Sequence, residues 1–382
     1  MHTENTIKHG IISGIFIFLI GLPFLGSIFD WDLYPQQSEN RNLAEFPDLE
    51  NTPVAMMPDG LENFFNDNFG FRNTLIRRHR KIEKKFFKRG SSKVLKGKTP
   101  GWFFYKKAGT VDDFMGNRQL TPEELLIWQE ALEERKNYLA EKGVPYIFFV
   151  CPDKTMVYPE HLPDSTRNSR GQTRLEQLSK HLRAHSDVEI VYPLPELLAA
   201  KSDNLLYLPA DTHWNAYGGY IGYRKVVSAL QTYYPELEPV PLDDCTLIPM
   251  EAKADLATMY TTEDQMMTFD LIKRPETFDI TQTICTAYTN SAWVEKMKSD
   301  RPTLDTYPDG KRTALIIHDS FAGHGPAALL PTHFNKSYLF WMYVETPDFK
   351  QLVDELKPDV VIEMRVERSL RFIPGQGTAG WE

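Results

Sequence analysis

The chain has 382 residues, of which 42% are hydrophobic and 25% charged, a composition that supports a large folded core and excludes global disorder. Its formal net charge of -9 argues against nucleic acid as the main partner, because phosphate binding needs a basic surface. The chain holds only three cysteines, so no disulfide framework is expected, although one bridge between Cys245 and Cys285 is allowed in an oxidising compartment.

An apolar run near the N-terminus, Ile11–Phe29, contains 19 residues without a charged side chain. Such a run is long enough to cross a bilayer as a helix. Lys8 precedes it and Asp30 and Asp32 follow it, which predicts a cytoplasmic N-terminus and an exported chain. We therefore interpret residues 1–30 as a cytoplasmic stub and a single-pass signal anchor. A cleaved signal peptide is the alternative, which the absence of an A-x-A site disfavours.

Residues 31–98 are interpreted as a juxtamembrane segment and a basic helix. The segment begins as a polar stretch punctuated by prolines, and apolar residues take helical spacing from Leu75 onward. Between Arg72 and Lys98 there are twelve Lys or Arg residues and a single acid, Glu83. Such charge runs usually form a solvated helix face. The alternative is a contact surface for anionic lipid headgroups or for an acidic polysaccharide.

Residues 99–382 are predicted to form one α/β domain, because strand-like and helix-like segments alternate along the chain. Thr121, Pro122 and Glu124 form a capping box that begins a helix reaching to about Lys142. The alternation predicts a parallel sheet. Strands are expected at 99–109 (a strand or hairpin), 144–150, 188–192, 313–317, 337–343 and 358–364, and further helices at 174–185, 195–201, 216–234 and 349–356. Residues 239–307 are the least regular stretch and are interpreted as an insertion that walls the site.

The segment Pro209–Asn215, "PADTHWN", places a carboxylate two residues before an imidazole. Residues at this spacing project to the same side of an extended chain, so Asp211 can meet a ring nitrogen of His213 and fix its tautomer. The aromatic Trp214 follows directly and is expected near the site. Asn215 can cap the next helix, whose small residues Gly218, Gly219 and Gly222 allow close packing on the sheet.

A nucleophile for this pair is expected at Ser320. It follows the buried-type strand 313–317 in a turn of small residues, a placement that exposes a hydroxyl to substrate. The alternative is a serine that caps a helix. Ligands of open α/β sheets bind beyond the carboxyl ends of the strands. Three more residues at such ends are therefore candidates near the site: Lys154, which a structural salt bridge would also explain, Asp319 and Arg365.

A metal site is the second interpretation of the same region, since imidazole and carboxylate groups suit several divalent ions. Their spacing matches no known zinc signature. The residues concerned are Asp211, His213, His318, Asp319 and His324.

The blocks "DTHWN" and "HDSFAG", about a hundred residues apart, resemble the alginate O-acetyltransferase family of SGNH-hydrolase-like proteins, the AlgX/AlgJ type. Supporting segments are "ENRNLAEFPDL", "NDNFGFRNTLI", "GWFFY", "CPDKTMVYPEHLP" and "KPDVVIEMRVERSL". The resemblance implies a three-layer α/β sandwich with a mostly parallel central sheet in rearranged topology, preceded by one transmembrane helix. By matching positions it implies that Ser320 is the nucleophile, His213 the general base and Asp211 the residue orienting it, with no cofactor.

The resemblance also implies an inner-membrane protein whose catalytic domain faces the periplasm. It would transfer acetyl groups to an exported polysaccharide, with the donor supplied through a membrane-bound O-acyltransferase. An acetyl esterase using the same triad and a non-catalytic part of a polysaccharide assembly complex are the alternatives. His318 departs from the small residue that many relatives carry there. The chain order Asp, His, Ser predicts that Ser320 arrives from strand 313–317 within reach of His213.

Overall fold

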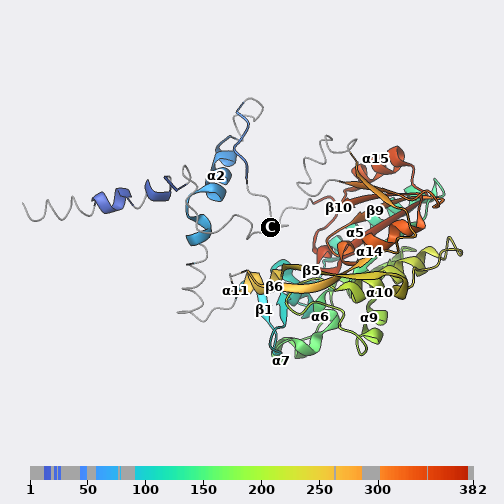
Figure 1. Cartoon of the computed structure of the whole chain (residues 1–382), viewed down its shortest axis with the longest axis horizontal. Coiled ribbons are helices and arrows are strands. Elements are labelled where there is room, and N and C mark those ends of the chain that lie inside the picture. The colour runs from blue at the N-terminus through green and yellow to red at the C-terminus, as the bar shows by residue number, and fades with distance from the viewer. Residues whose placement is uncertain are drawn as a thin grey trace, which may run out of the picture. The chain divides into compact units, whose positions relative to one another are not determined.

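The computed structural model describes residues 13–18, 21–23, 25–26, 44–49, 57–75, 78, 91–261, 264–285, 302–341 and 343–376. The chain divides into two compact units, Met1–Arg89 and Gly90–Trp381 (Figure 1). Each unit is described by itself. The three cysteines lie in the second unit and all are free thiols.

The first unit contains helix α2 (Met57–Asn68). Asp67 at its end is buried and accepts a hydrogen bond from the backbone amide of Ala44 at 2.8 Å. None of the helices in the described part of the chain combines the length and the apolar character needed to cross a bilayer. Residues 11–12, 19–20, 24 and 27–29 of the expected anchor lie outside the described residues, as do 76–77 and 79–90 of the basic segment.

A seven-stranded sheet forms the centre of the second unit, with strand order β4-β3-β11-β9-β10-β8-β7. The first five strands in this order run parallel, and β8 and β7 add antiparallel pairs at one edge. The predicted α/β fold with a mostly parallel sheet is therefore confirmed. The bounds are β3 (Tyr146–Cys151), β4 (Ile190–Val191), β7 (Thr281–Ile284), β8 (Thr303–Thr306), β9 (Thr313–His318), β10 (Lys336–Trp341) and β11 (Val360–Val366).

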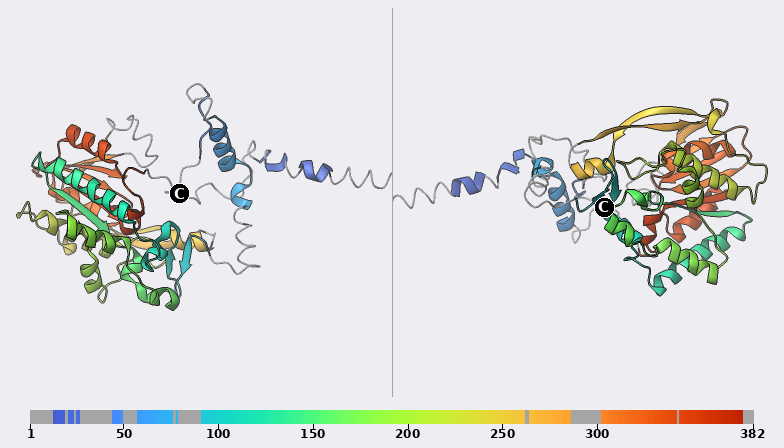
Figure 2. Two further views of the ribbon diagram at one scale, coloured as in Figure 1. Left: turned by 180° about the vertical axis from the view of Figure 1, so that it is seen from behind. Right: turned by 90° about the horizontal axis from the view of Figure 1, so that it is seen from below.

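Helices cover both faces of this sheet and make three layers (Figures 1 and 2). One face carries α10 (Ala216–Leu230), and the other carries α5 (Pro122–Ala140), α8 (Arg174–His185) and α15 (Thr346–Leu356). Alternate residues of β3 supply the two cores, Phe149 on the α10 side and Phe148 on the α5 side. The shorter helices are α4 (Thr110–Phe114), α6 (Lys154–Val157), α7 (Asp164–Asn168), α9 (Leu194–Ala200), α11 (Asp255–Thr261) and α14 (Pro326–Leu329). The 3-10 turns are η3 (Lys107–Gly109), η4 (Pro159–His161), η5 (Leu242–Asp244), η6 (Ala322–His324), η7 (Leu330–His333) and η8 (Glu367–Arg371).

The expected local signals form as predicted. The side chain of Thr121 accepts from the amide of Glu124 and begins α5, and Gly143 beyond its end has φ 69°. Of the strand or hairpin expected at 99–109, strand β2 (Phe103–Tyr105) forms, and it pairs with β1 (Val94–Lys96), which lies before the expected range. These strands are antiparallel, with Lys96 opposite Phe103.

The stretch 239–307 holds more regular structure than its sequence predicts. Strands β5 (Thr246–Lys253) and β6 (Met266–Lys273) pair over eight residues each, and α11 lies between them. We call this segment, 246–273, the arm; Figure 2 shows its two strands in yellow. Most side chains of β5 are exposed, so the sequence lacks the alternation that marks a half-buried strand. Strands β7 and β8, further along, belong to the central sheet.

The glycines of α10 permit close packing, as predicted, but with other partners than the sheet. A Cβ atom added to Gly222 would lie 2.6 Å from the ring of Trp214. One added to Gly219 would lie 2.0 Å from the carbonyl oxygen of His324, in the turn that follows Ser320. These two positions therefore hold the "DTHWN" segment and the Ser320 turn against one helix.

We expect Gly219→Ala to destabilise the fold by about 1 to 3 kcal/mol, the usual cost of overpacking, because the backbone of the Ser320 turn must move. Gly323→Ala is the matched control, since an added Cβ there meets no atom within 4 Å. Thermal unfolding of both variants measures the difference. Equal melting temperatures would contradict the close approach of α10 to this turn.

Candidate active site

The "PADTHWN" segment folds into a compact loop before α10. Tyr207 and Trp214 form an isolated antiparallel bridge at its base, and the amide of Leu208 donates to the carbonyl of His213 at 3.2 Å. The carboxylate of Asp211 turns back over the loop, where its Oδ1 accepts from the backbone amide of His213 at 3.0 Å. The loop itself therefore brings this carboxylate to the imidazole.

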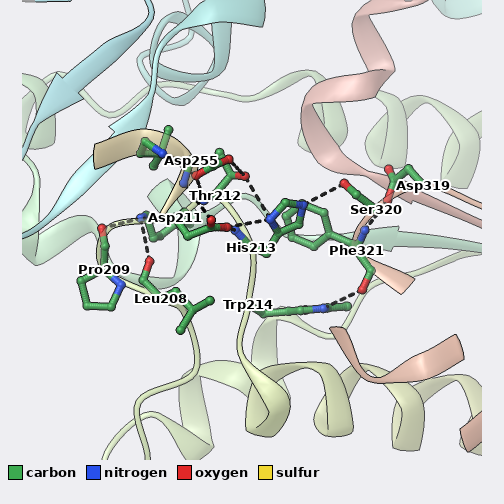
Figure 3. Close-up of polar contacts among 12 residues, drawn as sticks. Leu208, Pro209, Asp211, Thr212, His213, Trp214, Asp255, Asp319, Ser320 and Phe321 are labelled. Carbon is green, nitrogen blue, oxygen red and sulfur yellow. Dashed lines mark hydrogen bonds and ion pairs between the residues drawn. The ribbon is translucent and has the colours of Figure 1, made fainter. Parts of the chain in front are cut away.

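Three side chains form a continuous hydrogen-bonded chain (Figure 3). Oδ1 of Asp211 lies 2.7 Å from Nδ1 of His213, and Nε2 of His213 lies 2.8 Å from Oγ of Ser320. Ser320 comes from the turn after β9, 107 residues further along the chain. The structure thus brings together the three residues that the sequence proposes as base, orienting acid and nucleophile.

Electrostatics within the pair favour an ionised Asp211. Burial alone would raise its pKa, but the hydrogen bond and charge of His213 outweigh burial and hold the pKa below its usual range. Burial would likewise lower the pKa of His213, and the hydrogen bond and charge of Asp211 raise it above 6.5. The side chain of His213 is 16% exposed, so the imidazole is largely screened from solvent. These are the conditions under which a carboxylate orients and stabilises an imidazole base.

Asp319 organises the turn that carries Ser320. Its Oδ1 accepts from the amide of Phe321 at 3.0 Å. Its Oδ2 accepts from the amide of Val366 at 2.7 Å and from the hydroxyl of Tyr343 at 2.8 Å. Asp319 thereby ties the Ser320 turn to the end of the neighbouring strand β11.

Trp214 lies beneath the site and not at its surface. Its side chain is fully buried, and Nε1 donates to the carbonyl oxygen of Phe321 at 2.8 Å. This bond joins the residue after His213 to the residue after Ser320. The position suits support of the site rather than contact with a substrate.

Lys154 is buried behind the "PADTHWN" loop, at the start of α6. Its ammonium donates to the backbone carbonyls of Leu208 at 3.1 Å, Pro209 at 2.9 Å and Asp211 at 2.6 Å. It also lies over the ring of Phe104, 5.4 Å from the centroid. The alternative of a structural salt bridge is not what forms, because the partners are carbonyl oxygens.

Arg365 lies on the face of β11 that packs against α5, whereas its neighbours Met364 and Val366 face the core on the α10 side. Its Nε donates to Oε1 of Glu363 at 2.6 Å, and its guanidinium lies 5.4 Å from the ring centroid of Trp128 on α5. Glu363 also accepts from Arg135 at 2.7 Å and from the hydroxyl of Tyr146 at 2.6 Å. Among the described residues Arg365 makes no hydrogen bond to the Ser320, His213 and Asp211 chain, so it belongs to a buried ionic cluster under α5.

Two residues near the triad were not assigned to it from the sequence. The ring of His324 stacks on that of His213 at 4.5 Å, and burial, together with the His213 charge, lowers the pKa of His324 to about 3. Arg368, three residues beyond Arg365, pairs with Asp153 at 2.5 Å and lies over the ring of Phe321. The charged residues at the end of β11 predicted a functional group at the carboxyl edge of the sheet, but the sequence does not say which of the two arginines faces the site.

A third such residue is Asp255, the first residue of α11 on the arm. Its Oδ1 accepts from the amide of Thr212 at 2.9 Å, and its Oδ2 accepts from the hydroxyl of Thr212 at 2.6 Å. Its own amide donates to Oδ2 of Asp211 at 3.1 Å. Since it lies in the stretch with least periodicity, no local sequence signal identifies it.

The geometry does not favour the metal interpretation. Within the described ranges, the one group of potential ligands close enough to share an ion is Asp211, His213 and Asp255. The carboxylate oxygens of both acids already accept hydrogen bonds, from backbone amides, the Thr212 hydroxyl and the His213 ring. His318 and Asp319 lie outside this group; the ring of His318 contacts the carbonyl of Asp319 and stacks on Trp341.

Comparison with known proteins relates the chain to acetyltransferases. The family described as "SGNH hydrolase-like domain, acetyltransferase AlgX" matches residues 94–286, half of the chain. A probable alginate O-acetylase AlgJ of Pseudomonas syringae pv. tomato is 24% identical over 247 residues. That match covers 64% of this chain and 59% of the relative, so the chain spans less than two thirds of the relative's length.

Two solved structures are similar to this chain at low identity, and the first of them shows the same fold. Bacillus cereus PatB1 with a sulfonyl adduct has a TM-score of 0.52 and 15% identity, covering 72% of this chain and 95% of that one. The O-acetyltransferase domain of Pseudomonas putida AlgJ has a TM-score of 0.42 and 14% identity, covering 75% and 95%. The family match includes Asp211 and His213 and ends before Ser320. The folded chain brings Ser320 to within 2.8 Å of Nε2 of His213. The chain belongs to the AlgX-type family of SGNH hydrolase-like acetyltransferase domains.

Proposed function

We propose that this protein is an O-acetyltransferase that modifies an exported polysaccharide through a Ser320, His213 and Asp211 triad. The observation that carries the proposal is the hydrogen-bonded chain from Asp211 Oδ1 through both ring nitrogens of His213 to Ser320 Oγ, with links of 2.7 and 2.8 Å. Family membership supports the reaction class. The same arrangement activates a serine for acyl transfer on several unrelated folds.

The first half of the reaction forms an acetyl-enzyme. Nε2 of His213 takes the hydroxyl proton as Oγ of Ser320 attacks the acetyl carbonyl carbon of the donor. The tetrahedral intermediate collapses, the bond to the leaving group breaks, and the leaving group takes the proton from His213. Backbone amides at Ser320 and in a neighbouring loop would stabilise the oxyanion, at about 3 kcal/mol for each donor.

The second half transfers the acetyl group. His213 takes the proton of a sugar hydroxyl as its oxygen attacks the ester carbon on Ser320, and the proton returns to Oγ when the enzyme ester breaks. If water attacks in place of the sugar, the same steps give an acetyl esterase. Which acceptor resolves the acetyl-enzyme separates the two activities.

The setting of the reaction belongs to the same proposal. The apolar run Ile11–Phe29 and its flanking charges favour a single-pass inner-membrane anchor with the catalytic unit in the periplasm. The acetyl donor would reach the site through a membrane-bound O-acyltransferase. The AlgJ and AlgX relatives favour alginate or a similar exopolysaccharide as acceptor.

Replacing the nucleophile or the base tests the proposal directly. In Ser320→Ala and His213→Ala, we expect turnover of an activated acetyl ester to fall by at least about 10³-fold, because each removes a step of the acyl transfer. Mass spectrometry of the purified full chain with acetyl donor and oligosaccharides follows acetyl gain or loss. An acetylated Ser320 peptide in the wild type would support the intermediate, and full activity in Ser320→Ala would refute the triad.

The pH dependence follows from the raised pKa of His213. The base works only with Nε2 unprotonated. We therefore expect kcat/KM to be low at acid pH and to rise with pH through an apparent pKa above 6.5. In Asp211→Asn the loss of the neighbouring negative charge should move this acid limb to lower pH, while the rate falls by about 10⁴-fold. Rates from pH 5 to 9 measure both effects. An acid limb at or below 6.5 in the wild type would contradict the raised pKa of His213.

A further inference from the structure

The arm contacts the loop that carries Asp211 and His213 through the carboxylate of Asp255. Both oxygens of Asp255 bind Thr212, the residue between Asp211 and His213, and the amide of Asp255 binds Asp211 itself. The amide of Ala257, in the same helix, donates to the carbonyl of Ala210 at 3.0 Å. The first turn of α11 is therefore joined to three consecutive residues of the loop that carries the base.

The hydroxyl of Thr212 has one proton, and its contacts decide where that proton points. Its Oγ1 lies 2.6 Å from Oδ2 of Asp255 and 3.3 Å from Nδ1 of His213. An ionised carboxylate can only accept, so the Thr212 proton goes to Asp255. Toward His213 the hydroxyl then offers a lone pair, which matches the proton that Nδ1 donates to Oδ1 of Asp211 at 2.7 Å. With Nδ1 protonated, Nε2 of the neutral ring is left to accept the proton of Ser320.

We propose that Asp255 is a positioning residue of the catalytic base, which acts through Thr212 and Asp211 to hold His213 in the Nδ1-protonated tautomer. The first turn of α11 is then part of the catalytic site, because it contacts the loop that carries Asp211 and His213. This inference rests on the proposed function for its kinetic consequences, while the state of the His213 ring can be measured without turnover.

Charge supports the same role. The ligand atoms of Asp255, Asp211 and His213 lie within 4.8 Å of one another, and the Asp255 charge raises the pKa of His213. Burial and the charge of Asp211 raise the pKa of Asp255 to about 6. Other charged or titratable groups face this pair from neighbouring elements: Lys154 of α6, Tyr105 of β2, His324 after β9 and Arg368 after β11.

The variant Asp255→Asn removes the charge and keeps the shape. Its amide can donate to the Thr212 hydroxyl, which frees the Thr212 proton for Nδ1 of His213 and favours the wrong tautomer. In the full chain we expect kcat to fall about tenfold with KM unchanged, since a charge-assisted hydrogen bond is lost. The acid limb should move down by at least about 0.5 pH unit, the effect of one charge at this separation. Glu251→Gln, an exposed acid on β5, is the control and should change neither.

The His213 ring is also observed directly. NMR titration of the histidine ring signals, with His213 assigned by its loss in His213→Gln, should show a lower His213 pKa in Asp255→Asn than in the wild type. An unchanged His213 pKa and acid limb would overturn the inference. A shifted His213 pKa in a chain where Ser320→Ala remains fully active would instead support the positioning role and overturn the proposed function alone.

Thr212 provides a second test that keeps every charge. Thr212→Val removes the hydroxyl and should lower kcat about tenfold, whereas Thr212→Ser keeps it and should restore most of the rate. If Asp255→Asn does not fold, this pair still decides the question. Equal rates in the valine and serine variants would contradict the path through Thr212.

Discussion

The site depends on a buried ammonium group. Lys154 begins α6, shortly after strand β3 of the central sheet ends. Its three N–H donors are directed at three carbonyl oxygens of the loop 208–211. Those carbonyls converge on one point only if the loop turns tightly, and the same turn places Asp211 against His213. Burial lowers the pKa of Lys154 to about 7, against the opposing effect of the Asp255 and Asp211 charges. Its hydrogen-bond acceptors are backbone oxygens, so the lysine fixes main-chain shape without competing for the carboxylate of Asp211.

The fold joins two separate halves of the site. The base comes from the loop before α10 and the nucleophile from the turn after β9, and Trp214 and Phe321 link the two through a buried hydrogen bond of 2.8 Å. Asp319 links the second half to β11 by a bond of 2.7 Å to Val366. The two halves are therefore joined by a second hydrogen bond besides the one between His213 and Ser320, and the half that carries Ser320 is also bound to β11. A shared set of rigid neighbours keeps Ser320 and His213 within hydrogen-bond distance, as acyl transfer requires.

Sequence reasoning succeeded where a local signal decides the structure. The capping box at Thr121 begins α5, and continuous apolar runs predict β3, β9 and β11. It failed where placement depends on the face of an element or on distant packing. Arg365 and Arg368 follow one another at the same sheet edge, yet one binds Glu363 under α5 and the other covers Phe321. Asp255 follows β5, whose side chains are mostly exposed, so no hydrophobic period marks this part of the chain.

The position of β11 has a consequence for how the chain folds. This strand is made last, yet it pairs with β3 on one side and β9 on the other, in the middle of the sheet. During synthesis the edges of β3 and β9 must wait unpaired until residues 360–366 are available. Unpaired strand edges invite pairing with other chains, and contacts between distant segments form slowly. The sheet therefore cannot be completed progressively from its N-terminal strands, and its interior closes only when β11 is inserted between β3 and β9.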